Sequence, residues 1–168
     1  MRKAAAIVML SVLTGSIGAA QTDSFAPLRF LLGQWRAIDT QPGETGAFAF
    51  TLAVQDHVVI RTNEANYAAT AGRAASRHDD LLVIYAENSS VKADYFDNEG
   101  HIIRYTVEPL GDRAVAFVSA PDPRQPRYRL IYRGGANDTL VGTFEIAPSE
   151  SPDAFKLYLS WKATHSQP

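Results

Sequence analysis

Large and small side chains alternate along several stretches of the chain. Residues 47–54 would place large side chains on one face and small ones on the other: Phe48, Phe50, Leu52 and Val54 against Ala47, Ala49, Thr51 and Ala53. The same period occurs at 127–133, where Tyr128, Leu130 and Tyr132 alternate with Arg127, Arg129 and Arg133, and at 155–162, where Phe155, Leu157, Leu159 and Trp161 alternate with Lys156, Ser160 and Lys162. Because successive side chains of a strand point to opposite faces, this period predicts β-strands with one apolar and one polar face.

Clusters of Gly, Pro, Asn and Asp separate these stretches at fairly even spacing. A helical turn is expected over Phe25–Leu32, with Pro27 near its start, followed by a first strand around Gly33 and Trp35. Nine further strands are expected near 45–54, 57–66, 79–87, 90–97, 101–109, 113–119, 127–133, 139–147 and 155–164. The alanine-rich segment 67–78 lacks strand character, and we interpret it as a mobile flap.

The strand pattern predicts an all-β fold with a single domain. About ten antiparallel strands joined by short turns, with no helix long enough to cover a sheet face, are best satisfied by closure into a barrel, which removes exposed edges. We therefore expect one antiparallel up-and-down β-barrel with a short N-terminal helical turn.

The first twenty residues have the features of a secretory signal peptide. Arg2-Lys3 precedes the apolar run 4–13, and Gly18-Ala19-Ala20 supplies small residues for cleavage after Ala20. The expected division is a signal peptide at 1–20 and a lipocalin-like barrel at 21–168, located in the periplasm or secreted. No second apolar segment suggests a membrane span after cleavage.

Charge and cysteine content exclude several functional classes. Removing Arg2 and Lys3 leaves 14 basic against 18 acidic residues, a formal net charge of −4, and no basic stripe stands out. Nucleic acid is therefore not an expected partner. The chain has no cysteine, which excludes disulfides, thiolate metal sites and cysteine nucleophiles. The common hydrolase, metalloprotease, P-loop and dinucleotide-binding motifs do not occur in residues 21–168.

Residues 31–35, Leu31-Leu32-Gly33-Gln34-Trp35, resemble the Gly-x-Trp segment that begins the barrels of the lipocalin and nitrobindin-like (calycin) superfamily. In such barrels the glycine allows a tight turn into the sheet and the tryptophan closes one end. The hairpin at 95–100 extends the resemblance, and segments around 78–81, 100–103 and 144–148 are similar to a group of exported bacterial proteins, a likeness that brings no activity with it.

The resemblance does not extend to a haem site. Arg36-Ala37-Ile38 follows the tryptophan where nitrobindins carry more glycine, and the only histidine comparable with their haem ligand is His165, three residues from the chain end. No cofactor is therefore expected.

Aromatic residues on the predicted strands suggest a site for a small apolar or amphiphilic ligand. Such sites are apolar with a few hydroxyl groups, and a ten-stranded barrel is wide enough to leave a cavity. The candidate ligand-binding residues are Trp35, Tyr85, Tyr95, Tyr105, Arg129, Tyr132 and Trp161. These aromatic side chains could equally fill the core.

The strand arginines have two interpretations. Arg61, Arg104, Arg127, Arg129 and Arg133 could form an inner socket for a carboxylate or phosphate, or could line the solvent face. The second interpretation is favoured because lone buried charges are costly.

A second hypothesis is a metal-dependent or acid-base enzyme. It would use His78, Asp80, Asp97 and His101, which lie at predicted hairpin ends where neighbouring strands could bring them close. The alternative is that these residues cap turns. A third possibility is an envelope protein that acts through an exposed apolar surface.

Overall fold

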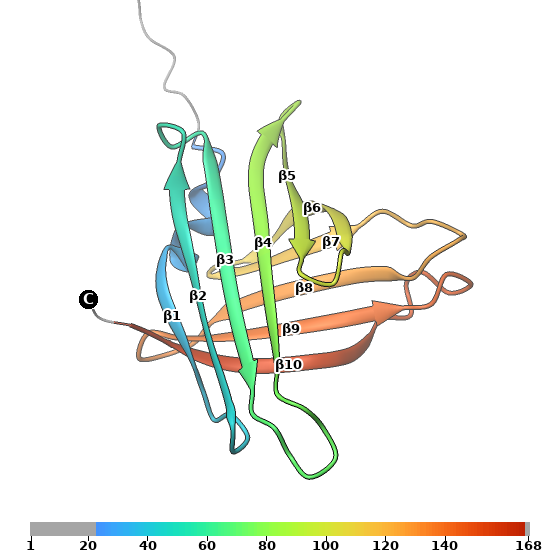
Figure 1. The fold of residues 1–168 in the computed structure, drawn as a ribbon. Coiled ribbons are helices and arrows are strands. Elements are labelled where there is room, and N and C mark those ends of the chain that lie inside the picture. Colours follow the sequence, from blue (N-terminus) through green and yellow to red (C-terminus); the bar gives the residue numbers. More distant parts are fainter. Residues whose placement is uncertain (1–22, 167–168) are drawn as a thin grey trace, which may run out of the picture.

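A computed structural model describes residues 23–166, which form the predicted closed antiparallel up-and-down barrel of ten strands preceded by a short 3₁₀ helix (Figure 1). The elements are η1 (Ala26–Leu31), β1 (Gly33–Ile38), β2 (Glu44–Ala53), β3 (Val58–Tyr67), β4 (Ser76–Glu87), β5 (Ser90–Asp97), β6 (Ile102–Gly111), β7 (Ala114–Ser119), β8 (Arg127–Gly134), β9 (Thr139–Ala147) and β10 (Lys156–His165). Each strand pairs with its neighbours in sequence, and β1 closes the barrel against β10. The all-β prediction is confirmed.

The predicted signal peptide, residues 1–20, lies outside the described residues. Among residues 23–166, no helix is both long enough and apolar enough to span a bilayer.

Several strand boundaries differ from the sequence-based expectation, as the region from β2 to β4 shows. β3 continues through Tyr67 and β4 begins at Ser76, so the loop in place of the expected flap is limited to 68–75. Val54, expected on β2, lies instead in the β2–β3 turn with a φ of 52° and a largely exposed side chain. A β-branched residue rarely adopts this conformation, so the alternating pattern that included Val54 continued one residue too far.

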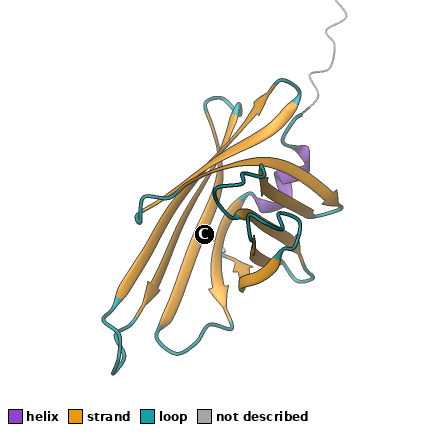
Figure 2. Cartoon of the chain, turned by 90° about the vertical axis from the view of Figure 1, so that its right-hand side faces the viewer, coloured by secondary structure: helices purple, strands orange, loops and turns teal. Residues whose placement is uncertain are grey.

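The 3₁₀ helix closes one end of the barrel. Pro27 stands at its first turn, where a missing N–H costs nothing, and the buried Leu28 and Leu31 face the strands. Trp35 follows on β1 with only 3% of its surface exposed, and its indole N–H donates to the Leu31 carbonyl at 2.7 Å. Figure 2 shows η1 lying against one end of the strands. We call the half of the barrel next to η1 the closed half.

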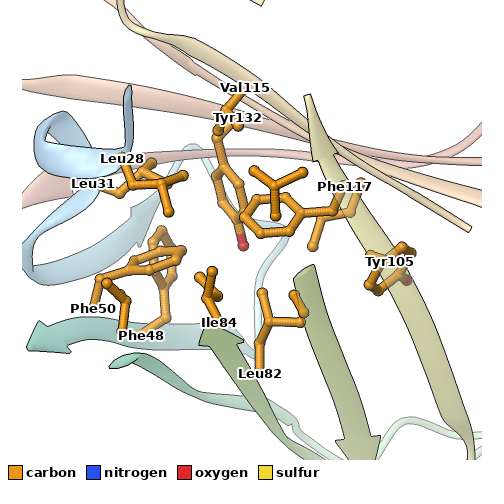
Figure 3. Packing of buried hydrophobic residues seen from close by; sticks show 14 of the residues in the cluster. Leu28, Leu31, Phe48, Phe50, Leu82, Ile84, Tyr105, Val115, Phe117 and Tyr132 are labelled. Carbon is orange, nitrogen blue, oxygen red and sulfur yellow. The ribbon is translucent and has the colours of Figure 1, made fainter. Parts of the chain in front are cut away.

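The closed half contains the hydrophobic core. Its inward side chains interlock in edge-to-face aromatic contacts, such as Phe50 with Tyr132 at 5.4 Å and Phe117 with Tyr132 at 6.2 Å between ring centroids. Figure 3 shows Leu28 and Leu31 from η1 meeting these rings and Ile84 in one cluster. Such packing leaves this half of the barrel filled.

The opposite end carries the loops 39–43, 68–75, 98–101, 120–126 and 148–155, and we call this half the open half (Figure 1). β1 is short, and it pairs with β10 only from Trp35 to Ile38. Beyond Ile38, the edge of β10 over residues 156–161 therefore has no paired strand within the described residues.

A β-bulge corrects the predicted pattern of the last strand. Leu157 pairs with Glu145 and Leu159 with Phe144, so Tyr158 is the extra residue and the two leucines fall on opposite faces. Phe155 lies outside the barrel, where it packs on a small outer cluster of Ala116, Val118 and Ile131. The prediction that residues 155, 157, 159 and 161 share one face is therefore wrong.

Candidate functional site

The inner wall differs in exposure between the two halves of the barrel. In the closed half, inward residues such as Phe50, Ile84 and Leu140 are 0–1% exposed. Toward the open end, most inward residues are half-buried, and Leu159 is 49% exposed: Asn63, His78, Tyr95, Ile103, Tyr128, Phe144, Leu159 and Trp161. Solvent therefore reaches an inner wall that is mainly aromatic and aliphatic.

Most aromatic side chains of this wall come from β8, β9 and β10, and Tyr95 comes from β5. The rings of Tyr128 and Phe144 are stacked, with centroids 5.9 Å apart and planes within 8°. Trp161 lies edge-on to Tyr132, 5.9 Å away, and so reaches from the open half to the buried core. Its ring fits over Gly142, where an added Cβ would come within 2.2 Å of it. Only glycine leaves room for the indole at this position.

A buried ion pair forms the base of the open half. Arg61 on β3 donates through Nη1 to Oδ1 of Asp80 on β4 at 2.6 Å, and both side chains are at most 5% exposed. Asn63 donates to the other Asp80 oxygen at 2.9 Å. Burial raises the pKa of Asp80, and the Arg61 charge opposes that shift. The guanidinium also lies over the rings of Phe48 and Tyr132, at 5.8 and 6.0 Å.

Three tyrosines from other strands lie near enough to Arg61 to act on it electrostatically. Tyr95, Tyr105 and Tyr132 point inward from β5, β6 and β8. Burial raises the pKa of each hydroxyl, to about 12 for Tyr132, so all three are hydrogen-bond donors at neutral pH. These tyrosines place neutral hydroxyl groups near the ion pair and add no charge.

Two buried donors in this region have no partner among the described residues: Nε of Arg61 and the hydroxyl of Tyr132. Figure 3 shows the Tyr132 hydroxyl directed into the middle of the core. Buried polar groups are nearly always hydrogen-bonded, and Arg61 lies near enough to Tyr132 to influence its pKa as a hydrogen-bond partner, so a small movement or one enclosed water can satisfy both groups.

The residues of the enzyme hypothesis do come close together. His78 Nε2 lies 3.4 Å from Asp80 and 3.2 Å from the Tyr95 hydroxyl, while His101 Nδ1 lies 2.9 Å from Asp97. Asp97 is nevertheless occupied in its turn, where it accepts from the backbone N–H groups of Glu99 and His101.

This arrangement fits the turn-capping alternative for Asp97. Within residues 23–166, no three His, Asp or Glu side chains are placed to hold one metal ion. The structure lends no support to the enzyme hypothesis.

The candidate ligand-binding residues divide between the two faces. Five of them point inward: Trp35, Tyr95, Tyr105, Tyr132 and Trp161. Tyr85 and Arg129 lie on the outer face, where Tyr85 approaches Asp94 and Arg129 donates to Glu145 at 2.6 Å. Because strand neighbours alternate, these two side chains are directed away from the interior.

Of the strand arginines considered, Arg61 is buried inside the barrel. The solvent-face interpretation therefore fails for Arg61. Asn63 was not recognised as a site residue, although it stands two positions from Arg61 and so shares its face. Polar residues at 61 and 63 resemble a solvent-facing pattern, and only their pairing with Asp80 reveals that they face inward.

Two hollows in the described part of the chain are unsuited to an amphiphile. A cavity of about 30 Å³ between η1 and the β2–β3 hairpin, next to Phe25 and Val59, is large enough for about one water. A shallow depression beside the 68–75 loop, near Tyr67 and Arg77, faces open solvent. The inner wall of the open half is therefore the best candidate site.

The closed ten-stranded antiparallel barrel is consistent with a calycin-like fold. No protein-family model matches the chain, and no curated protein matches it.

Proposed function

We propose that this protein binds a small apolar or amphiphilic molecule inside the open half of its barrel. The observation that carries the proposal is the contrast in exposure between the two halves, since the core around Phe50 is sealed while Leu159 and Trp161 remain accessible. A ligand covering this wall would remove apolar surface from water, at roughly 25 cal/mol per Å² buried.

The same wall supplies a few polar groups that can orient the ligand. Asn63, His78 and Tyr95 lie at the edge of the buried Arg61–Asp80 pair and are half-buried. An aromatic and aliphatic surface with a small polar cluster is the usual composition of a small-molecule site. An amphiphile would place its chain along Phe144 and its polar group toward Asn63.

We also infer that the protein is exported to the periplasm or secreted, and that it is related to the lipocalin and nitrobindin-like barrels. The Arg2-Lys3 pair, the apolar run 4–13 and Ala20 support export. The Gly33-Gln34-Trp35 segment supports the relationship, because Trp35 lies at the closed end of the barrel as the resemblance implies. Intact-mass measurement of the exported protein tests signal-peptide cleavage, because the expected product begins at Gln21.

Native mass spectrometry of the protein purified from the exported fraction tests ligand binding directly. A co-purified molecule of reproducible mass is expected, and it should be lost after delipidation.

Fluorescence provides a second measurement, because the chain has only two tryptophans. Adding an amphiphile should shift the emission of Trp161 in a Trp35→Phe variant and leave the emission of Trp35 in a Trp161→Phe variant nearly unchanged. Absence of a bound molecule, together with equally slow acrylamide quenching of both tryptophans, would refute the proposal.

A further inference from the structure

The charge at the base of the open half is balanced within the protein. Arg61 and Asp80 form a 2.6 Å pair with both side chains at least 95% buried, so the base of the open half holds one positive and one negative group in direct contact. A charged headgroup would lose hydration here and find no net opposite charge to offset that loss. For a carboxylate, the attraction of Arg61 is opposed by the repulsion of Asp80, and for an ammonium the two effects are reversed.

The same region has unused hydrogen-bonding capacity. The accessible part lies at the edge: Asn63 gives its amide N–H to Asp80, while its carbonyl oxygen and the Tyr128 hydroxyl form no hydrogen bond within residues 23–166. The Arg61 Nε and the Tyr132 hydroxyl are fully buried and lie out of reach of a headgroup. The edge therefore offers one donor and one acceptor to an incoming group.

We propose, resting on the proposed function, that the site selects amphiphiles with an uncharged hydrogen-bonding headgroup, such as a primary amide or an alcohol, over the matching carboxylate and ammonium. An amide oxygen can accept from the Tyr128 hydroxyl at the accessible edge, and its N–H can donate to the Asn63 carbonyl. Neither contact disturbs the Arg61–Asp80 pair. The alkyl chain then lies along Tyr128, Phe144 and Leu159.

Four probes of equal chain length test this selectivity: decanamide, 1-decanol, decanoate and decylamine. Affinity is measured at pH 7.5 from Trp161 emission and checked by isothermal titration calorimetry. The expected result is that decanamide and 1-decanol bind at least tenfold more tightly than decanoate and decylamine. Equal or tighter binding of decanoate or decylamine overturns the headgroup inference while leaving the proposed function intact. Absence of binding by all four probes overturns both.

Two matched hydroxyl deletions locate the headgroup. Tyr128→Phe removes the free hydroxyl at the accessible edge, and Tyr85→Phe removes one from the outer face of β4. Losing one hydrogen bond should weaken decanamide binding about three- to tenfold in Tyr128→Phe, while Tyr85→Phe should bind as the wild type does. Equal effects of the two substitutions would place the headgroup elsewhere and overturn the inference.

Charge substitutions provide a readout that a purely structural role would not change. Asp80→Asn leaves Arg61 without its partner and should reverse the preference, so that decanoate binds more tightly than decanamide. If this variant does not fold, Asn63→Asp serves instead. Position 63 is half-buried and so tolerates a charge more easily, and the new carboxylate would add a negative charge beside Asp80. That substitution should make decylamine the preferred probe. Unchanged headgroup selectivity in the variant that folds would contradict the inference.

Discussion

Replacing Asp80 by Asn should destabilise the protein more than any conservative substitution on its surface. The Asp80 and Arg61 side chains are 3% and 5% exposed, and asparagine keeps the shape of the side chain while removing the charge that neutralises the guanidinium. Removing one partner of a buried ion pair typically costs about 3–5 kcal/mol in the free energy of unfolding. For a domain with a total stability of about 5–15 kcal/mol, that is a large fraction.

The partner substitution should cost less. Arg61→Met leaves Asp80 hydrogen-bonded to Asn63, and burial already raises the pKa of Asp80, so this carboxyl can take up a proton and become neutral. The double variant carries no buried charge at either position. We therefore expect it to be more stable than Asp80→Asn alone, with a coupling energy of about 2 kcal/mol or more between the two sites.

Urea denaturation followed by far-UV circular dichroism measures all four free energies of unfolding. The linear dependence on urea concentration should have the same slope in each variant, so that differences in midpoint report stability. If the two single costs simply add in the double variant, the coupling energy is zero. That result would refute the argument that Arg61 and Asp80 interact as a pair inside a water-poor barrel.

Three further predictions concern Trp35, the Asp97 turn and Gly142. Trp35→Phe removes the donor to the buried Leu31 carbonyl and should lower the free energy of unfolding by about 1–3 kcal/mol, as measured by urea denaturation. This loss should be clearly larger than that of Trp161→Phe, and equal losses would contradict the role of Trp35 in closing the barrel. The hydrogen bond to Asp97 raises the pKa of His101 above 6.5, so this pair contributes to stability fully below pH 6.5 and its contribution is lost as the pH rises through the raised pKa. Asp97→Asn should bring the pKa of His101, followed by NMR, back toward 6.5; an unchanged titration would exclude Asp97 as the cause. Gly142→Ala places a Cβ 2.2 Å from the Trp161 ring, so the ring must move; the Trp161 emission should shift to the red and the free energy of unfolding should fall by about 1–3 kcal/mol. Emission like that of the wild type would show that the ring does not pack against Gly142.

Local sequence patterns determined the number and approximate limits of the strands. Alternation such as Phe48-x-Phe50 and glycines such as Gly100, with its φ of 90°, depend only on near neighbours in the chain, so they could be recognised without tertiary structure. The burial of Trp35 is what the resemblance of Gly33-Gln34-Trp35 to the calycin barrels implies. The same patterns failed at Tyr158, because a bulge depends on how β10 meets β9 rather than on either strand alone.

The composition of the site was decided only by the closed barrel. Arg61 and Asp80 are 19 residues apart, and only the register of β3 against β4 turns both of them inward. Tyr132 reaches the same place from β8 because the sheet closes on itself. A polar residue on a strand is usually directed to solvent, and its pattern is the same whether it faces water or a polar interior. The sequence therefore determined which residues form strands. The register of the strands and the closure of the barrel decided which of their polar side chains meet in the interior.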